Sequence, residues 1–564
     1  MSNKKITISQ DFIYMVFLIK KRLPLLLALV LLSFGTIRAS ESLKDTAVSI
    51  DELQHIATGF EWLENKTYEL EALHPPLARI ISALPLYIFK NVRLGQGFYT
   101  KYCPMNLPKD YKKEYEGRIK GGKAIFCGLN ESEHTERVIL ARISSLLFFT
   151  IGGLGIYAWS RSAFNARVAC LATFFYSNLP IILASCIIIN TDMAGSAFLI
   201  WTLYFIPIWL KAPTNRNSLV VGMLIGIVAI SKFSSIIFLG LCFAVLGLYL
   251  GSQNKKLISG LQLSEWRSRL IIILSAFTVI WSAYHFSTEE VFGLNILPFP
   301  EFFRGLGELI ARNKIPFLGY IFGKILLFKG VWYFFPVATF FKTPLSFLLM
   351  FLGSIWLAMK LRTKQIILIL LLILSIYFIG AASNINIGLR HMLPAFMLMC
   401  ITNAHFVDYC WHRFKNLISK FAIIAAIFSY LLSSAIAHKD YISYFNIMAG
   451  NTPEDILIEG DFDIGQDAKK LADYLSSAHI MEKTVFYSYN IVHPDCYGIT
   501  HYKILFGANR KEFKVEFGTH KYLASAKVVP KFLPQAALRE INQCTNPIYI
   551  GETIIIFDKK NCRF

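Results

Sequence analysis

Eleven long apolar runs, separated by polar connections, dominate residues 1–437. They lie at 23–38, 138–159, 168–189, 194–210, 219–234, 236–251, 269–285, 342–360, 365–382, 391–408 and 418–437. About 17 to 25 apolar residues are enough to cross the hydrocarbon layer of a membrane as a helix. The pattern therefore predicts eleven membrane-spanning helices.

Two of these runs allow a second interpretation. The third run contains Asn178-Leu179-Pro180 and could form two half-helices, because proline removes a backbone donor. The first run could be the apolar region of a signal peptide that ends near Ala39-Ser40. Its preceding basic region is long, and we therefore favour a retained span.

The pattern changes after residue 437 and becomes that of a small α/β domain. Gln466 to Ser477 has helical apolar spacing, and Thr484 to Tyr489 is typical of a strand. Pro547 to Asp558 predicts two strands around Gly551-Glu552. We therefore expect a transmembrane domain over 1–437, with long connections at 39–137 and 286–341, and an α/β domain over 438–564.

Composition and charge support a membrane protein and argue against a nucleic-acid-binding one. Hydrophobic residues make up 55% of the chain, charged residues 17%, and the mean hydropathy is +0.48. The formal net charge is +20, but residues 438–564 carry 15 basic and 15 acidic residues. The whole excess thus lies among the apolar runs, as the positive-inside rule predicts.

The basic residues also predict how the bundle is oriented. They precede the first run and fill every second connection, for example at Arg161, Lys211, Arg362 and Arg413. With eleven spans, the N-terminus is then cytoplasmic, and the two long connections and the tail lie outside.

The chain has ten cysteines, and their spacing does not resemble a zinc site. Cys103 and Cys127 bracket one outer loop and could form a disulfide in an oxidising compartment. We expect no metal and no cofactor.

Ionisable residues recur where the predicted spans meet the outer side. The acids are Asp51, Glu52 and Asp192. The basic residues and histidines are His74, Arg142, Lys232, Lys342, Arg390 and His391. Carboxylates can accept a proton, and a group of cations can stabilise a leaving phosphate. The set therefore suits transfer of a group from a lipid-linked phosphate without a metal.

Each residue also has a simpler interpretation. Basic residues at span ends often only reach toward the interface. Asp51, Glu52 and Asp192 could stabilise helix N-termini, and His74 could be an interfacial residue before a proline-started helix. Their accumulation on the face opposite to the one rich in positive charge favours a shared site.

At this point the residues resemble the dolichyl-phosphate-mannose–protein mannosyltransferases and their bacterial relatives, membrane glycosyltransferases of the GT-C type. The resemblance covers nearly the whole chain. It is carried by Asp51-Glu52, His74-Pro75-Pro76-Leu77, Arg142, Asp192, Lys232, Lys342-Thr343-Pro344 and Gly388-Leu389-Arg390-His391, and in the tail by Tyr444-Phe445-Asn446, Asp463 to Asp467 and Tyr497-Gly498-Ile499.

The resemblance implies an inverting transfer of one sugar from a polyprenyl phosphate to an acceptor hydroxyl at the outer face of a bacterial inner membrane. It makes Asp51 the base, Glu52 a residue that orients acceptor or sugar, and Asp192 an acid of the same site. His74 stands where related aminoarabinose transferases have a lysine on the lipid phosphate. Arg142, Lys232, Lys342, Arg390 and His391 are the other candidates for phosphate binding.

Two departures from the family pattern concern the tail, where Ile464 replaces a tryptophan and Asn451 replaces a glycine. They put the acceptor side in doubt more than the donor side. Neither the sugar nor the acceptor, which could be a protein, a glycolipid or a polysaccharide, follows from the sequence. Two rival functions are a lipid or solute transporter and a non-catalytic membrane scaffold.

Overall fold

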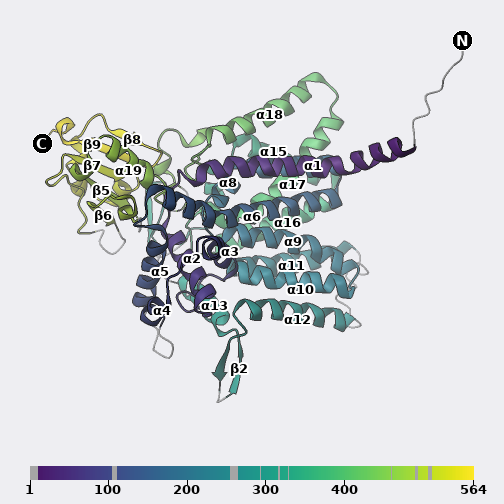
Figure 1. Cartoon of the computed structure of the whole chain (residues 1–564). Helices are drawn as coiled ribbons and strands as arrows, with labels where there is room; N and C mark the ends of the chain where they lie inside the picture. Colours follow the sequence, from purple (N-terminus) through teal and green to yellow (C-terminus); the bar gives the residue numbers. More distant parts are fainter. Residues whose placement is uncertain are drawn as a thin grey trace, which may run out of the picture.

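The protein is a bundle of long helices with a small sheet-containing domain at one end (Figure 1). The computed structural model describes residues 10–103, 111–253, 265–291, 294–314, 318–327, 330–458, 460, 462–489, 493–505 and 511–563. The polytopic helical fold with a C-terminal α/β domain, expected from the sequence, is confirmed.

All eleven predicted runs are helical. The bundle helices are α1 (Gln10–Leu43), α6 (Glu131–Ala163), α7 (Ala166–Asn178), α8 (Pro180–Cys186), α9 (Asp192–Lys211), α10 (Asn215–Ser231), α11 (Phe233–Gln253), α12 (Trp266–Ala283), α14 (Phe334–Lys342), α15 (Leu345–Leu361), α16 (Lys364–Ala382), α17 (Leu393–Arg413) and α18 (Leu417–Ile436). Helices form there because a backbone in lipid must satisfy its own hydrogen bonds.

Fewer than eleven of these helices can cross a membrane by length and apolarity alone. Among the described residues, seven qualify, or nine when two bent pairs are each counted as one span. The remaining predicted spans are α10, which has only 17 residues, and α17, which is less apolar because it carries Asn403, His405 and Asp408. The count of eleven thus exceeds what these criteria support.

The predicted break in the third run is confirmed. α7 ends at Asn178, α8 begins at Pro180, and the two helices meet at 63°. Arg38 of α1 lies beside this break and donates to Asn178 Oδ1 at 3.0 Å and to Ser434 Oγ of α18 at 2.9 Å. α14 and α15 form a second bent pair, at 120°.

Shorter elements cover one end of the bundle, which we call the loop end (Figure 1). They are α2 (Ile50–Glu64), α3 (Leu77–Phe89), α4 (Gln96–Tyr102), α5 (Tyr111–Phe126), α13 (Pro300–Arg312) and the hairpins β1 (Thr288–Val291) with β2 (Leu294–Pro298) and β3 (Leu318–Ile321) with β4 (Lys324–Leu327). The first four come from the predicted 39–137 connection and the rest from the 286–341 connection.

The C-terminal domain contains α19 (Ala468–Ser477) and a five-stranded mixed sheet in the order β6-β5-β7-β9-β8. The strands are β5 (Thr484–Tyr489), β6 (Tyr502–Leu505), β7 (Tyr522–Ala526), β8 (Ile548–Ile550) and β9 (Ile554–Asp558). The predicted helix and three predicted strands are confirmed. The hairpin β3-β4 also contributes Tyr320 to the core of this domain.

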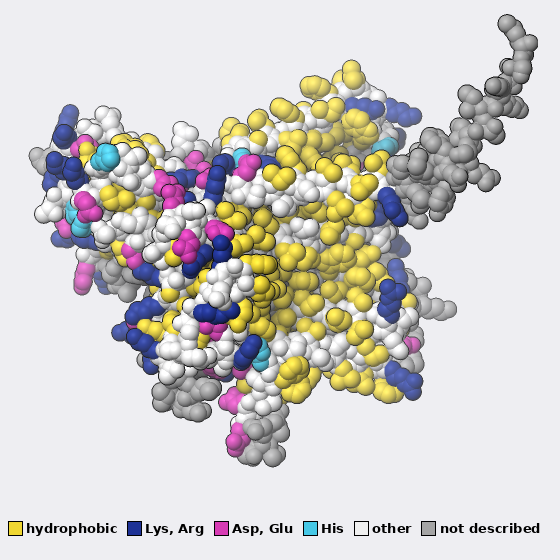
Figure 2. Space-filling model, viewed as in Figure 1, with side chains coloured by type: hydrophobic (Ala, Val, Ile, Leu, Met, Phe, Trp, Pro, Cys, Tyr) yellow, Lys and Arg dark blue, Asp and Glu magenta, His cyan; other side chains and the backbone are white. Residues whose placement is uncertain are grey.

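Charged side chains lie at the two ends of the bundle, on either side of an apolar band. Figure 2 shows a broad apolar band, with Lys and Arg at the end away from the loop end. Arg161, Lys211 and Arg413 lie there, in the last turns of α6, α9 and α17. The orientation across the membrane stays a prediction.

The disulfide that the sequence left open between Cys103 and Cys127 does not form. Cys127 pairs with Cys496 of the C-terminal domain, Cys544 pairs with Cys562, and Cys103 is a buried free thiol. Proximity along the chain does not determine pairing, because the fold brings Cys496 to the turn between α5 and α6.

Candidate functional site

Arg390 joins the two acids that the sequence singled out on different helices. It lies in the 3₁₀ turn Leu389–Met392 before α17. Its Nη2 donates to Asp51 Oδ2 at 3.0 Å, and its Nε lies 3.8 Å from Asp192 Oδ2. Asp51 is in the first turn of α2 and Asp192 begins α9. The structure therefore brings the two predicted acids to one guanidinium group.

Lys232 and His391 complete this cluster around Asp192. Lys232 lies between α10 and α11, forms an ion pair with Asp192, and donates to His391 Nδ1 at 3.2 Å. Because Nδ1 accepts this hydrogen bond, the proton of neutral His391 is assigned to Nε2. The described residues offer this buried Nε2 no hydrogen-bond acceptor. The cluster thus contains one donor that a ligand could satisfy.

The two acids differ in their access to solvent. The side chain of Asp51 is 44% exposed, whereas that of Asp192 is 7% exposed and paired with Lys232. Of these two acids, Asp51 is therefore the one that is open to solvent.

His74 lies at the edge of the same cluster. Its ring packs edge-on against His55, and its Nε2 is 3.9 Å from Glu71 Oε1. Burial lowers the pKa of His74 to about 4, while nearby Glu71 and Asp51 act to raise it and Lys232 to lower it. His74 is therefore neutral at pH 7 and offers a single hydrogen bond rather than a fixed positive charge.

Sequence reasoning missed the residues that hold His74 in place. Fully buried Arg79 of α3 forms an ion pair with Glu71 and donates to Tyr68 Oη at 2.9 Å and to His55 Nδ1 at 3.0 Å. Tyr68 in turn donates to the carbonyl of His74 at 2.6 Å. Beside Arg79, the carboxyl of Glu71 keeps a pKa of about 2, although burial opposes this. The available signal was an arginine in an otherwise apolar helix.

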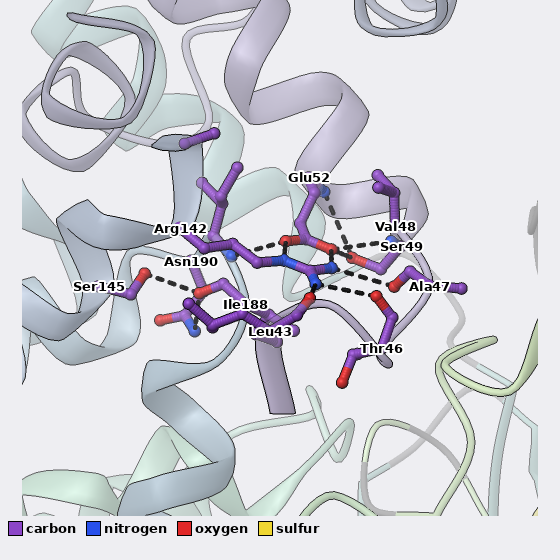
Figure 3. Close-up of polar contacts among 12 residues, drawn as sticks. Leu43, Thr46, Ala47, Val48, Ser49, Glu52, Arg142, Ser145, Ile188 and Asn190 are labelled. Carbon is purple, nitrogen blue, oxygen red and sulfur yellow. Dashed lines mark hydrogen bonds and ion pairs between the residues drawn. The ribbon is translucent and has the colours of Figure 1, made fainter. Parts of the chain in front are cut away.

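Glu52 does not have the role that the sequence predicted. Its side chain is 1% exposed, and it completes a capping box with Ser49. Both carboxylate oxygens accept from Arg142, at 2.7 and 2.8 Å, and Oε1 also accepts from the N–H of Ile189 at 3.0 Å (Figure 3). With its lone pairs used inside the protein, Glu52 cannot orient an acceptor or bind a sugar.

Arg142 is likewise not a phosphate ligand. Besides the two bonds to Glu52, its guanidinium donates to the carbonyls of Leu43, Thr46 and Ala47 (Figure 3). These contacts use all five of its N–H groups. Together, Glu52 and Arg142 hold the backbone before Asp51 and the backbone before Asp192. Their role is to position the two acids.

Asp192 does not cap its own helix either. Oδ1 of Asn190 accepts from the N–H groups of Asp192 and Met193, at 2.9 and 3.1 Å. The carboxylate of Asp192 is therefore left to the cation cluster.

Lys342 is close to the cluster but engaged elsewhere. Its Nζ donates to the carbonyl of Ile442 at 2.9 Å and lies 4.4 Å from the ring centre of Phe445. Lys342 and Arg390 line one small cavity, whose other walls are formed by Ile181, Ala184, Ser185, Ile188, Ile442, Gly460 and Ile464. Lys342 thus borders the site from the side of the C-terminal segment.

The tail motifs act as contacts between domains. Asn446 donates to the carbonyls of Phe340 and Thr343, at 2.6 and 2.8 Å. Gly460 approaches the loop before Arg390 so closely that a Cβ atom would lie 2.3 Å from the Ile387 carbonyl oxygen, and its φ is +61°. Gly460 and Ile464 therefore lie beside Arg390, where they line the same cavity.

No metal centre is found in the part of the chain that the structure describes, since no three His, Cys, Asp or Glu side chains are grouped to hold an ion there. The expectation that neither metal nor cofactor takes part stays a prediction.

These features define a multi-pass membrane protein with an acid and cation cluster at one end of its bundle. The sequence model of one family, described as dolichyl-phosphate-mannose-protein mannosyltransferase, matches residues 133–281. The resemblance expected from the sequence is thus confirmed for that segment, which contains Arg142, Asp192 and Lys232. Asp51, His74, Arg390 and the tail lie outside it.

Two solved structures show a similar chain course. ArnT from Cupriavidus metallidurans, bound to undecaprenyl phosphate, is 12% identical with a TM-score of 0.48, over 94% of this chain and 97% of ArnT. The oligosaccharyltransferase AglB from Archaeoglobus fulgidus, in complex with an inhibitory peptide and a dolichol-phosphate, is 11% identical with a TM-score of 0.46, over 90% and 70%. The search of curated proteins found no match.

Proposed function

We propose that this protein is a membrane glycosyltransferase of the GT-C type, which moves a sugar from a polyprenyl phosphate to an acceptor hydroxyl. The observation that carries the proposal is the Asp51–Arg390–Asp192 arrangement, in which one acid is open to solvent and the other is buried among cations. The family match over residues 133–281 supports the same reaction class.

The chemistry follows from the two environments. The acceptor oxygen gives its proton to Asp51 and attacks the anomeric carbon of the donor. The bond from that carbon to the phosphate oxygen breaks, and the polyprenyl phosphate leaves with the electron pair. A single displacement of this kind inverts the configuration at the anomeric carbon.

Cations and hydrogen-bond donors stabilise the departing phosphate. We assign this role to Lys232, Arg390 and the free Nε2–H of His391, with His74 at the edge. Lys342 lines one cavity with Arg390 and borders this group. The phosphate needs no metal in this scheme, because the guanidinium group of Arg390 is always charged at neutral pH and suits phosphate binding.

The donor and the location are extensions of this proposal. A mannosyl or other hexosyl group on undecaprenyl or a related polyprenyl phosphate fits the family description. The loop end would face outward from a bacterial inner membrane, where the acceptor is presented.

A transporter is the rival that the geometry disfavours. Substrate sites of secondary transporters lie near the middle of the membrane. Here Asp192 begins α9, Lys232 lies in the break between α10 and α11, and Arg390 precedes α17. All three lie at helix ends beside the loop elements, which suits an enzyme that meets its acceptor at the interface.

The experiment is to incubate purified protein with a panel of polyprenyl-phosphate sugars and candidate acceptors, and to measure the polyprenyl phosphate released. We expect acceptor-dependent release from one donor. A protein that moves lipid-linked sugars across vesicles but cleaves none of them would contradict the proposal and favour the transporter.

A further inference from the structure

The backbone before Asp51 is held from two sides. On one side, Arg142 donates hydrogen bonds to carbonyl oxygens, including that of Ala47 at 3.1 Å. On the other side, the N–H of Ala47 donates to the Gln466 carbonyl at 2.9 Å, and the N–H of Val48 donates to Tyr497 Oη at 2.7 Å. Both of these acceptors belong to the C-terminal domain. Ser49, the N-cap of α2, follows directly.

Tyr497 is held at this position by covalent and polar contacts with the α5–α6 turn. Its neighbour Cys496 is disulfide-bonded to Cys127, and Asp495 forms an ion pair with Lys123. The ring of His134 packs edge-on against Tyr497, with ring centres 5.3 Å apart. The tyrosine hydroxyl therefore reaches Val48 from a site that the disulfide links to the outer loop.

We propose that the C-terminal domain positions Asp51 through Tyr497, and that the Cys127–Cys496 disulfide keeps it in place, so that reduction of this bond slows sugar transfer. Tyr497 is a positioning residue in this scheme, because it contacts the backbone of Val48 and not a substrate. The inference rests on the proposed role of Asp51 and adds redox control to that site.

The redox step balances with a dithiol as reductant. One thiolate of the reductant attacks a sulfur of the Cys127–Cys496 bond, which breaks and leaves a mixed disulfide. The second thiol of the reductant displaces the remaining cysteine. Two electrons and two protons pass to the protein, which gains two thiols, and the reductant becomes a disulfide. Both cysteines are partly exposed and thus accessible to such a reagent.

The second disulfide serves as a control for effects of reduction that do not involve Cys127 and Cys496. Cys544 and Cys562 are 18 residues apart and both lie within the C-terminal domain. Breaking their bond cannot release this domain from the outer loop. A variant that lacks them also ensures that any effect of reductant comes from the other pair.

The experiment compares oxidised and reduced full-length protein in detergent, with the parent, C127S/C496S, C544S/C562S and Y497F. Alkylation and mass spectrometry report which thiols are reduced. Two quantities are measured: hydrogen exchange of the peptide that covers residues 43–53, and the kcat and donor KM of transfer. Reducing the folded parent avoids relying on variants that fold poorly.

We expect reduction to speed exchange at Ala47 and Val48 in the parent and in C544S/C562S, and to leave C127S/C496S unchanged. Loss of one hydrogen bond is worth about 0.5–1.5 kcal/mol, so Y497F should exchange about 2- to 13-fold faster at Val48. We expect kcat to fall by a similar factor, with donor KM unchanged.

Two results would distinguish failure of this inference from failure of the proposed transferase function. If exchange and kcat stay the same once Cys127 and Cys496 are reduced, the inference is wrong and the transferase function stands. If exchange responds as expected but no donor is consumed in either redox state, the positioning role stands and the proposed function fails.

Discussion

Asp51 and Glu52 are neighbours on one helix, yet they lie in opposite environments. Successive helical residues point about 100° apart. Glu52 therefore points into the protein, where Arg142 and backbone groups use all its acceptor capacity. Asp51 points toward the mouth of the bundle, where it shares Arg390 and remains partly exposed. Two adjacent acids in one motif can therefore have different roles: one stabilises the local structure, and the other is available for chemistry.

The largest effect on stability should come from breaking the buried ion pair between Glu52 and Arg142. Glu52→Ala leaves the guanidinium of Arg142 buried without its carboxylate, which typically costs about 3–5 kcal/mol. We expect a clearly lower thermal midpoint and poor recovery from the membrane. A variant as stable as the parent would show that Glu52 does not hold the site together.

The next largest effect is expected at Asp192, the buried acid that pairs with Lys232. Asp192→Asn removes the charge that faces Lys232, a charge-assisted hydrogen bond worth about 1.5–3 kcal/mol. If the transition state loses this interaction free energy, kcat/KM for transfer should fall by about 10- to 150-fold. Restoration of activity in D192N/K232M would instead show that the pair is merely structural.

A smaller effect is expected at His74, because this residue is neutral at pH 7. Its pKa of about 4 means that it gains a proton, and with it a better phosphate interaction, only as the pH falls toward 4. Between pH 6 and 8, the parent should show no change in donor KM from this group. His74→Lys carries its charge throughout this range and should lower the donor KM about threefold, since charged hydrogen bonds are roughly twice as strong. An unchanged KM in H74K, or a parent KM that rises steeply from pH 6 to 8, would contradict this role.

The smallest effect should come from a surface acid that belongs to neither environment. Glu116 lies on the exposed face of α5 and pairs with Lys120 one helical turn away. Glu116→Gln should leave both the thermal midpoint and the transfer rate unchanged, because solvent screens such surface pairs. It is the matched control for every acid-to-amide change above.

The sequence predicts local features of the fold well, because apolar periodicity is a local property. The bend at Asn178-Leu179-Pro180 and the strands around Gly551-Glu552 both appear where the pattern places them. The partners of Arg142 and Cys127 are distant in the sequence, so spacing along the chain does not identify them. The sequence alone does not show that Arg142 binds Glu52 instead of a phosphate, or that Cys127 pairs with Cys496 instead of Cys103. Arg79 was missed for the same reason, since its function depends on Glu71 and Tyr68 folding around it.

The central claim is that Asp51 is the base of the transfer reaction. It is tested most directly by the transfer rate of Asp51→Asn on the donor identified for the parent, beside donor binding and the thermal midpoint, with Glu116→Gln as control. General base catalysis contributes about 10²- to 10⁴-fold, and we predict a loss of that size with folding and donor binding retained. Transfer by D51N at the parent rate would contradict the claim.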